Sequence, residues 1–447
     1  MAYQSINRLF TCLLLLAACA PALADSPWDQ LPALLEKIQP PTFADKDFPI
    51  TAHGAKPGGK CDCRAAIADA ITACNQAGGG RVVVPAGEWF VKGPVHLLSN
   101  VNLHLEKDAT LLFSNDPEDF LPMVLTRFEG TELMNFSPPI WALDQENIAV
   151  TGQGTIDGQA DDKSWWKWKG NGTDDGNDLI DMADRNVPVA ERRFGSGRKM
   201  RVNFVQPYRC KNLLIEGITV HRSPMWCLNP VLCQNVTVRG VRVESHGPNN
   251  DGCNPESCDG VLIEECFFNT GDDCIAIKSG RNADGRRLAT PSQNIVVRNC
   301  TMRDGHGGVV LGSEMSGGIE NIFVENCQMD SPNLERAIRL KSNSRRGGYL
   351  RNMYVRDIEV GEVSDAVLRI NLRYFNEEGD YFPKVSNILL ERVVSKKSKR
   401  PLHLMGLPET LIEDVVLRDC DFRGAKKPSL IRDVANLTLE NVQMGDE

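Results

Sequence analysis

The stretch NLLIEG at residues 212–217 returns as NVTVRG at 235–240 and as NIVVRN at 294–299, and these copies decide the fold. Each copy opens with Asn, continues with three mostly apolar or β-branched residues, and ends on a polar pair. Such segments are typical of short strands. Further copies extend the series: NIAVTG at 147, GVLIEE at 260, NIFVEN at 321, NMYVRD at 352, NILLER at 387, DVVLRD at 414 and NLTLEN at 436.

The spacing of the copies predicts a solenoid. From position 212 onward they are 23, 25, 34, 27, 31, 35, 27 and 22 residues apart, too close for a helix and a second strand between them. We predict an all-β fold, a right-handed, single-stranded parallel β-helix whose coils stack at about 4.8 Å. The Asn residues suit left-handed turn positions, and stacked Asn side chains can hydrogen-bond as a ladder. A leucine-rich solenoid would need a leucine pattern that is absent.

The repeat extends over most of the chain, so we expect one β-helix domain at residues 25–447. The segment RAAIADAITAC at 64–74 has helical amphipathic spacing and predicts a short helix that caps the open N-terminal end. Residues 158–199 are the longest departure from the repeat, and we expect loops there. The tryptophans at 165, 166 and 168 could stack on sugars, but packing of this excursion against the solenoid is favoured.

Residues 1–24 resemble an export signal. Arg8 precedes an apolar run at 9–20, which is too short to span a bilayer, and Ala22-Leu23-Ala24 forms a cleavage site. A lipoprotein box at 16–19 is the alternative, with Cys19 as the lipid anchor. We expect a periplasmic or extracellular monomer with no membrane span.

Composition narrows the partners. A net charge of −9 argues against a nucleic-acid partner, which needs a dominant basic patch. Thirteen of the 15 cysteines follow the predicted signal, and no C-x-x-C pair indicates zinc. Their near-repeat spacing favours small buried core residues over redox chemistry. We expect no metal and no cofactor.

Four polar clusters interrupt the apolar repeat on successive coils. Asp251 and Asp272 are 21 residues apart, close to one coil, so stacking should bring Asp251 beside Asp272 and Asp273. Three crowded carboxylates should raise at least one pKa, which supplies an acid and a base together, as glycoside hydrolysis requires. The clusters are GPNNDGCNPESC from 247, NTGDDCIAIKSG from 269, DGHGGVVLGSEMSGG from 304 and RAIRLKSN from 336.

The last two clusters add cations and a histidine. Arg339 and Lys341 are two apart on a predicted strand and share one face, which suits an anionic substrate group. His306 lies in a glycine-rich bend one coil further along. Any one cluster alone would be more simply a solvated turn, but four in succession indicate a site.

These motifs resemble those of the polygalacturonases, glycoside hydrolase family 28. The family forms Asn-Thr-Asp, Gly-Asp-Asp, Gly-His-Gly and Arg-Ile-Lys stand here with Asn250 in place of Thr and Leu340 in place of Ile. The segments GGGRVVVPAGEW, NVNLHLEKDATLLFS and SPMWCLNP also look like family signatures. The four motifs stand at Asn249-Asn250-Asp251, Gly271-Asp272-Asp273, Gly305-His306-Gly307 and Arg339-Leu340-Lys341.

The resemblance implies a β-helix that hydrolyses α-1,4 linkages between galacturonate units with inversion. It implies Asp272 as general acid, Asp251 and Asp273 as the groups that activate water, and His306 as support for the acid. Arg339 and Lys341 would bind the substrate carboxylate, and Tyr374 in RYFNEEG resembles a binding-subsite tyrosine. One conflict is expected, since neighbouring coils place carboxylates nearer than the roughly 6.5–9.5 Å usual for inverting enzymes.

Other functions stay open at this point. A rhamnogalacturonan or xylogalacturonan hydrolase would share the fold, a pectate lyase would use calcium, and a non-catalytic carbohydrate-binding β-helix would need no crowded acids. We expect exo-action, because the polar loop at 279–293 and the excursion at 158–199 could close one end of the groove. Arg286 and Arg287 would then meet the terminal carboxylate.

Overall fold

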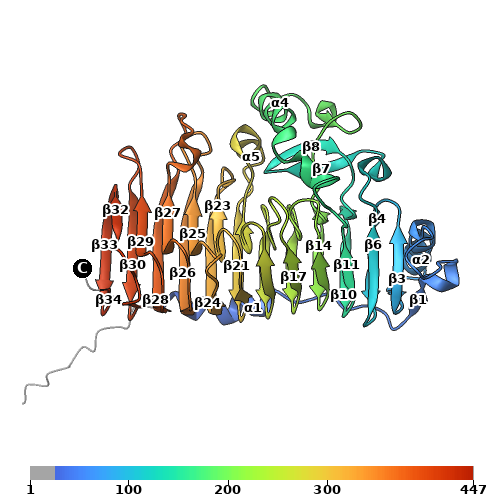
Figure 1. Cartoon of the computed structure of the whole chain (residues 1–447), viewed down its shortest axis with the longest axis horizontal. Helices are drawn as coiled ribbons and strands as arrows, with labels where there is room; N and C mark the ends of the chain where they lie inside the picture. Colours follow the sequence, from blue (N-terminus) through green and yellow to red (C-terminus); the bar gives the residue numbers. More distant parts are fainter. Residues whose placement is uncertain (1–25, 446–447) are drawn as a thin grey trace, which may run out of the picture.

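The Asn-initiated repeat forms a parallel stack of strands that runs the length of the molecule (Figure 1). A computed structural model describes residues 26–445, and the predicted export signal, including Cys19, lies outside them. Every inter-strand pairing in the stack is parallel, which gives the predicted right-handed parallel β-helix. Its first face comprises β1 (Asp47–Pro49), β2 (Gly80–Val84), β5 (Val101–Leu105), β10 (Glu146–Gly152), β14 (Lys211–Glu216), β16 (Gln234–Arg239), β18 (Asp259–Glu264), β21 (Ser292–Arg298), β24 (Ile319–Met329), β26 (Tyr349–Val360), β28 (Lys384–Ser395), β30 (Ile412–Arg418) and β33 (Val434–Glu440).

Two further faces complete each coil. The second face holds β3 (Gly87–Val91), β6 (Ala109–Phe113), β11 (Thr155–Asp157), β15 (Thr219–His221), β17 (Arg242–Ser245), β19 (Phe267–Thr270), β22 (Thr301–Met302), β31 (Asp421–Phe422) and β34 (Gln443–Met444). The third face holds β4 (Val95–His96), β9 (Ile140–Leu143), β13 (Val205–Tyr208), β20 (Ile275–Ile277), β23 (Val309–Gly312), β25 (Arg336–Lys341), β27 (Ala366–Asn371), β29 (Arg400–Met405) and β32 (Leu430–Arg432). Single-residue bridges through Leu228 and Cys253 connect β13 to β20 on this face.

The asparagine ladder forms as predicted. Asn212 and Asn235 have φ of 55°, in the left-handed region where Asn is enriched. The Nδ2 of Asn235 donates to Oδ1 of Asn212 at 2.8 Å, and Asn212 donates in turn to Asn147 at 2.8 Å. The same bond recurs from Asn321 to Asn294 and on to the C-terminal coils. Each rung satisfies a side-chain amide that the turn leaves exposed.

The interior of the coils is aliphatic, with cysteines among the branched side chains. All thirteen cysteines of residues 26–445 are free thiols, and twelve of them are buried. Burial raises the pKa of Cys227 and of Cys274 to about 12, so these thiols stay protonated and unreactive. The interpretation of the cysteines as small core residues is confirmed.

Two helical segments cover surfaces of the solenoid. Helix α2 (Arg64–Gln76) buries Ile67, Ile71 and Cys74 against the N-terminal coils, which confirms the predicted cap. The preceding segment, η1 (Pro27–Gln30) with α1 (Leu31–Lys37), was not predicted. It lies along the outside of the first face, where Trp28 packs against Phe323 and Tyr354.

The expectation of loops at residues 158–199 was wrong in part. This excursion contains η4 (Trp165–Lys167), α3 (Trp168–Asn171), α4 (Thr173–Asp184), η5 (Val189–Glu191) and β12 (Arg193–Phe194). Helix α4 and β12 pack on an antiparallel hairpin of β7 (Val124–Phe128) and β8 (Thr131–Asn135), through Leu179, Phe194 and Leu133. Trp165 is fully buried against Phe120 and Phe136, so packing of this tryptophan is confirmed.

Together with α5 (Asn282–Leu288), the excursion rises above the middle coils, on one side of the strand stack (Figure 1). The remaining short helices are η2 (Ile50–His53), η3 (Pro117–Phe120) and η6 (Tyr374–Asn376). Among residues 26–445, no helix combines the length and the apolar character that crossing a membrane requires.

Candidate active site

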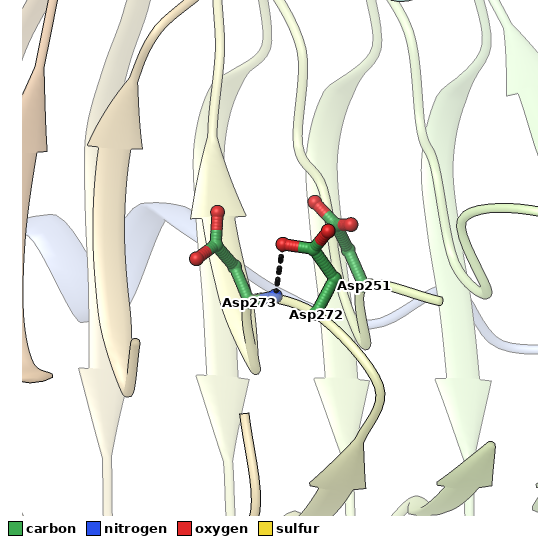
Figure 2. A group of neighbouring side chains, drawn as sticks. All are labelled: Asp251, Asp272 and Asp273. Carbon is green, nitrogen blue, oxygen red and sulfur yellow. Dashed lines mark hydrogen bonds between the residues drawn. The ribbon is translucent and has the colours of Figure 1, made fainter. Parts of the chain in front are cut away.

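The three predicted aspartates converge where the third face begins. Asp272 and Asp273 directly precede β20, and Asp251 lies in the coil before it. The backbone N–H of Gly252 donates to the carbonyl of Asp273 at 3.0 Å, which fixes the stacking of the two coils. Ligating oxygens of the three carboxylates lie within 4.8 Å of one another, and the side chains point the same way (Figure 2). The predicted juxtaposition is confirmed.

Asp251 is deeply buried. It is 2% exposed, and its Oδ2 accepts a hydrogen bond of 2.7 Å from Asn254. Its Oδ1 is buried with no hydrogen-bond partner among residues 26–445. Burial raises its pKa well above the usual value, and the negative charge of Asp272 raises it further. Burial and crowding therefore both favour the protonated form of Asp251, in line with the expectation of one raised pKa.

Asp272 forms a pair with His306. The Nδ1 of His306 lies 3.0 Å from Asp272 Oδ1, which also accepts the N–H of Asp273 at 2.9 Å (Figure 2). Burial opposes ionisation of Asp272, but the hydrogen bond from His306 and the charge of Lys341 outweigh it and lower the pKa of Asp272. The same hydrogen bond raises the pKa of His306. The pairing therefore favours the ionised form of Asp272 and the protonated form of His306.

Asp273 is held by the two predicted cations. Lys341 Nζ lies 2.7 Å from its Oδ2, and Arg339 Nη1 lies 3.3 Å from its Oδ1. Both cations come from β25, two residues apart, so the prediction of a shared face is confirmed. Tyr374 lies beside them, with its ring centroid 5.3 Å from Lys341 Nζ and 5.6 Å from Arg339 Cζ.

All seven residues predicted for the site line one cleft of about 550 Å³. Residues 190–441 match the family model described as glycosyl hydrolases family 28. The chain belongs to this family.

Similar proteins and solved structures carry polygalacturonase names. A hyperthermoactive exopolygalacturonase from Thermotoga maritima is 45% identical and superposes with a TM-score of 0.90, over 93% of this chain and 95% of that one. A probable polygalacturonase from Vitis vinifera is 29% identical over 81% of this chain and 71% of its own length. An exo-poly-alpha-D-galacturonosidase from Dickeya chrysanthemi is 27% identical over 76% of this chain, which spans 60% of that relative.

This family-28 glycoside hydrolase carries site residues that the motifs did not single out. Lys278, at the end of GDDCIAIK, is fully buried, with Nζ 3.8 Å from Asp251 Oδ2 and 3.2 Å from Glu314 Oε2. Trp226 lies beside it, with its ring centroid 4.6 Å from Nζ. These residues look like ordinary members of the repeat in sequence, and stacking of three coils is what brings them under the cleft.

The expectation for Arg286 and Arg287 was wrong. Both lie on α5 and face away from the catalytic cleft. Arg286 donates to the backbone carbonyl of Arg346 and lies over the ring of Tyr381, and Arg287 pairs with Glu132 and Asp284. The arginine of this segment that lines the family-28 cleft is Arg281, just before the helix.

The three aspartates also have the spacing of a metal site. Positive charge from Lys278, Arg339 and Lys341 already surrounds them. A divalent cation would have to compete with these three groups, so the donor set fits a metal poorly. The cluster fits acid–base chemistry on an anionic substrate better.

Proposed function

We propose that this family-28 enzyme hydrolyses α-1,4-galacturonosidic linkages in polygalacturonate and its oligomers. The observation that carries the proposal is the direct contact of Asp273 with Lys341 and Arg339 inside one cleft. Carboxylates supply acid and base for glycoside hydrolysis, and a cation pair beside them suits a sugar that itself bears a carboxylate. A sugar carboxylate would give these cations a second partner besides Asp273.

The proposed roles follow the family motifs. Asp272 donates a proton to the glycosidic oxygen, and Asp251 and Asp273 orient and deprotonate the attacking water. His306 holds the proton for Asp272 at 3.0 Å. In the free enzyme, the contact with Asp272 favours a proton on His306 and burial favours one on Asp251, so substrate binding would have to shift both.

Substrate binding supplies a reason for that redistribution. A substrate carboxylate that pairs with Lys341 offsets the positive charge that lowers the pKa of Asp272. The pKa of Asp272 then rises, and His306 can return the proton to it. Once Asp272 is neutral, its charge no longer adds to the effect of burial on the pKa of Asp251. Asp251 can then release its proton to solvent and act as base.

Inversion of the anomeric configuration is part of the proposal. The separation of the carboxylates alone would favour retention, because oxygens within 4.8 Å are closer than the roughly 6.5–9.5 Å typical of inverting enzymes. The family resemblance favours inversion, with the water held among the acids. Proton NMR of the first product decides it: inversion of an α-linkage gives the β-anomer, and retention gives the α-anomer.

Exo-action is supported by the wall at one end of the cleft. The tip of the β7–β8 hairpin, at Glu129 and Gly130, lies beside Arg281, whose N–H donates to the carbonyl of Gly130 at 3.0 Å. Helix α4 packs behind the hairpin. This hairpin and Arg281 border one end of the cleft, which favours binding of a chain end, proposed to be the non-reducing end. We further propose that the enzyme acts as an exported monomer, periplasmic or extracellular.

A reducing-sugar assay on polygalacturonate, with and without EDTA, tests the activity. We expect new reducing ends, no unsaturated product absorbing in the ultraviolet, and no loss with EDTA. Release of unsaturated product that EDTA abolishes would mean a lyase and would overturn the proposal.

A further inference from the structure

A second chamber lies behind the wall of the catalytic cleft. It has a volume of about 210 Å³, and it shares Glu129, Lys169 and Arg281 with the cleft. Its size suits one small group, since pockets for drug-sized ligands measure roughly 300–1,000 Å³. The ion pair between Arg281 and Glu129, at 2.8 Å, therefore stands between the two spaces.

The charge of this chamber is strongly one-sided. Four cations line it, against the single carboxylate of Glu129, which Arg281 already neutralises. The chain as a whole is acidic, with a net charge of −9, so this local excess of cations is not a property of the surface in general. The cations are Lys169, Lys199, Arg201 and Arg281.

Arg201 is the residue that points to a ligand. It is only 4% exposed, yet it forms no ion pair with any carboxylate of residues 26–445. Its guanidinium donates to the carbonyl of Pro248 at 2.5 Å and to Oδ1 of Asn249 at 2.6 Å. Burial lowers its pKa to about 10 although the charges of Glu129, Asp251 and Asp272 oppose this, since none of these carboxylates lies within ion-pair distance of it. Buried charges in proteins are normally paired, so an anion from outside would complete this site.

The arrangement also couples the chamber to the catalytic groups. Asn249, which accepts the hydrogen bond from Arg201, directs its Nδ2 at Oδ2 of Asp272, at 3.5 Å. On the opposite side, Trp168 lines the chamber with a half-buried indole, a surface on which a sugar ring can stack. An anionic sugar fits both the cations and this apolar wall.

We propose that the chamber is the recognition site for the carboxylate of the chain-terminal uronate unit, with Arg201 and Lys169 as its cations. This inference rests on the exo-action proposed above, because the chamber adjoins the end of the cleft at which a chain end would be bound. Arg201 and Lys169 thus take the role expected for Arg286 and Arg287, which do not line the cleft. The proposal also assigns a binding role to the segment around ERRFGSGRKMR.

The test compares trigalacturonate with the same trimer whose non-reducing terminal carboxylate is methyl-esterified. We expect the wild-type kcat/KM to be about 10²-fold lower for the ester, because the ester leaves the buried Arg201 unpaired. In Lys169→Gln and Arg201→Gln this preference should fall to a few-fold, while Arg201→Lys retains part of it. Arg185→Gln, an exposed change just after α4, should keep the full preference.

Three outcomes would overturn the inference. The wild type could hydrolyse both trimers equally, or the variants could keep the full preference. Arg201→Gln could also slow both trimers equally, which would mean that Arg201 acts only through Asn249. Calorimetric titration with free galacturonate and with galactose keeps the test independent of hydrolysis: tighter binding of galacturonate that Lys169→Gln does not weaken contradicts the inference even if the proposed activity itself fails.

Discussion

Replacing Asp272 by Asn removes the transferable proton and keeps the shape of the side chain. Asn can still accept the N–H of Asp273 through its oxygen, so the local backbone should hold. General acid catalysis contributes roughly 10²–10⁴-fold, so kcat should fall by that factor, which corresponds to about 2.7–5.5 kcal/mol in the barrier. The lost pair with His306, whose side chain is 47% exposed, contributes at most about 1 kcal/mol to stability. Activity should therefore collapse while the melting temperature changes little.

Asp259→Asn is the matched control for this prediction. Asp259 accepts the ladder hydrogen bond of Asn294 at 2.7 Å, and on other rungs the acceptor of this bond is an Asn side chain. The control should keep wild-type kcat on oligogalacturonate. Initial rates and thermal melting of both variants form the assay. More than about a tenth of wild-type kcat in Asp272→Asn would remove Asp272 from the proposed role.

Three further predictions concern recognition, pH and stability. Lys341→Ala should raise KM for oligogalacturonate by at least 10-fold, since a buried charge-assisted contact contributes about 1.5–3 kcal/mol. The change also removes one of the two cations that pair with Asp273. Unchanged steady-state kinetics would mean that Lys341 does not bind substrate. The raised pKa of His306 should place the alkaline limb of the kcat/KM profile above pH 6.5. The contribution of His306 to stability should be complete below pH 6.5 and be lost as the pH rises through the pKa of the folded state. An alkaline limb that His306→Gln leaves unchanged would contradict this. Asn321→Ala should lower the free energy of unfolding by about 2–3 kcal/mol, because Ala disfavours a φ of 56° and two ladder hydrogen bonds are lost. Asn321→Gly should cost less, because Gly tolerates this φ. Melting curves of Asn321→Ala equal to those of the wild type would refute the ladder's contribution.

The fold was predictable because its signal repeats. Each coil carries its own Asn and its own apolar strand, so a wrong strand prediction in one coil does not affect the prediction for the next coil. The cap α2 was predictable for a similar reason, since its apolar spacing is local. The segment of η1 and α1, which carries Trp28, was not predictable, because the apolar residues that it covers are spread over several coils, from Leu262 to Leu389.

The site was predictable only where residues stand out from the repeat. Asp251, Asp272 and Asp273 interrupt an apolar pattern and are one coil apart, so stacking alone brings them together. Lys278 and Arg201 carry no such mark, and their importance comes from burial that only the folded chain shows. The direction of the pKa shift of each aspartate could not be predicted from the sequence either, because it depends on which carboxylate His306 contacts and which one Lys278 contacts.

The proposed exo-hydrolysis of polygalacturonate is tested most directly by the products of early digestion. Chromatography of the soluble products and viscometry of the remaining polymer would be followed over the first few per cent of bonds cleaved. The closed end of the cleft predicts a single short product, monomer or dimer, from the first time point, with viscosity falling slowly. A ladder of mid-sized oligomers with rapid loss of viscosity would contradict this account, because it would show that the chain binds along an open groove.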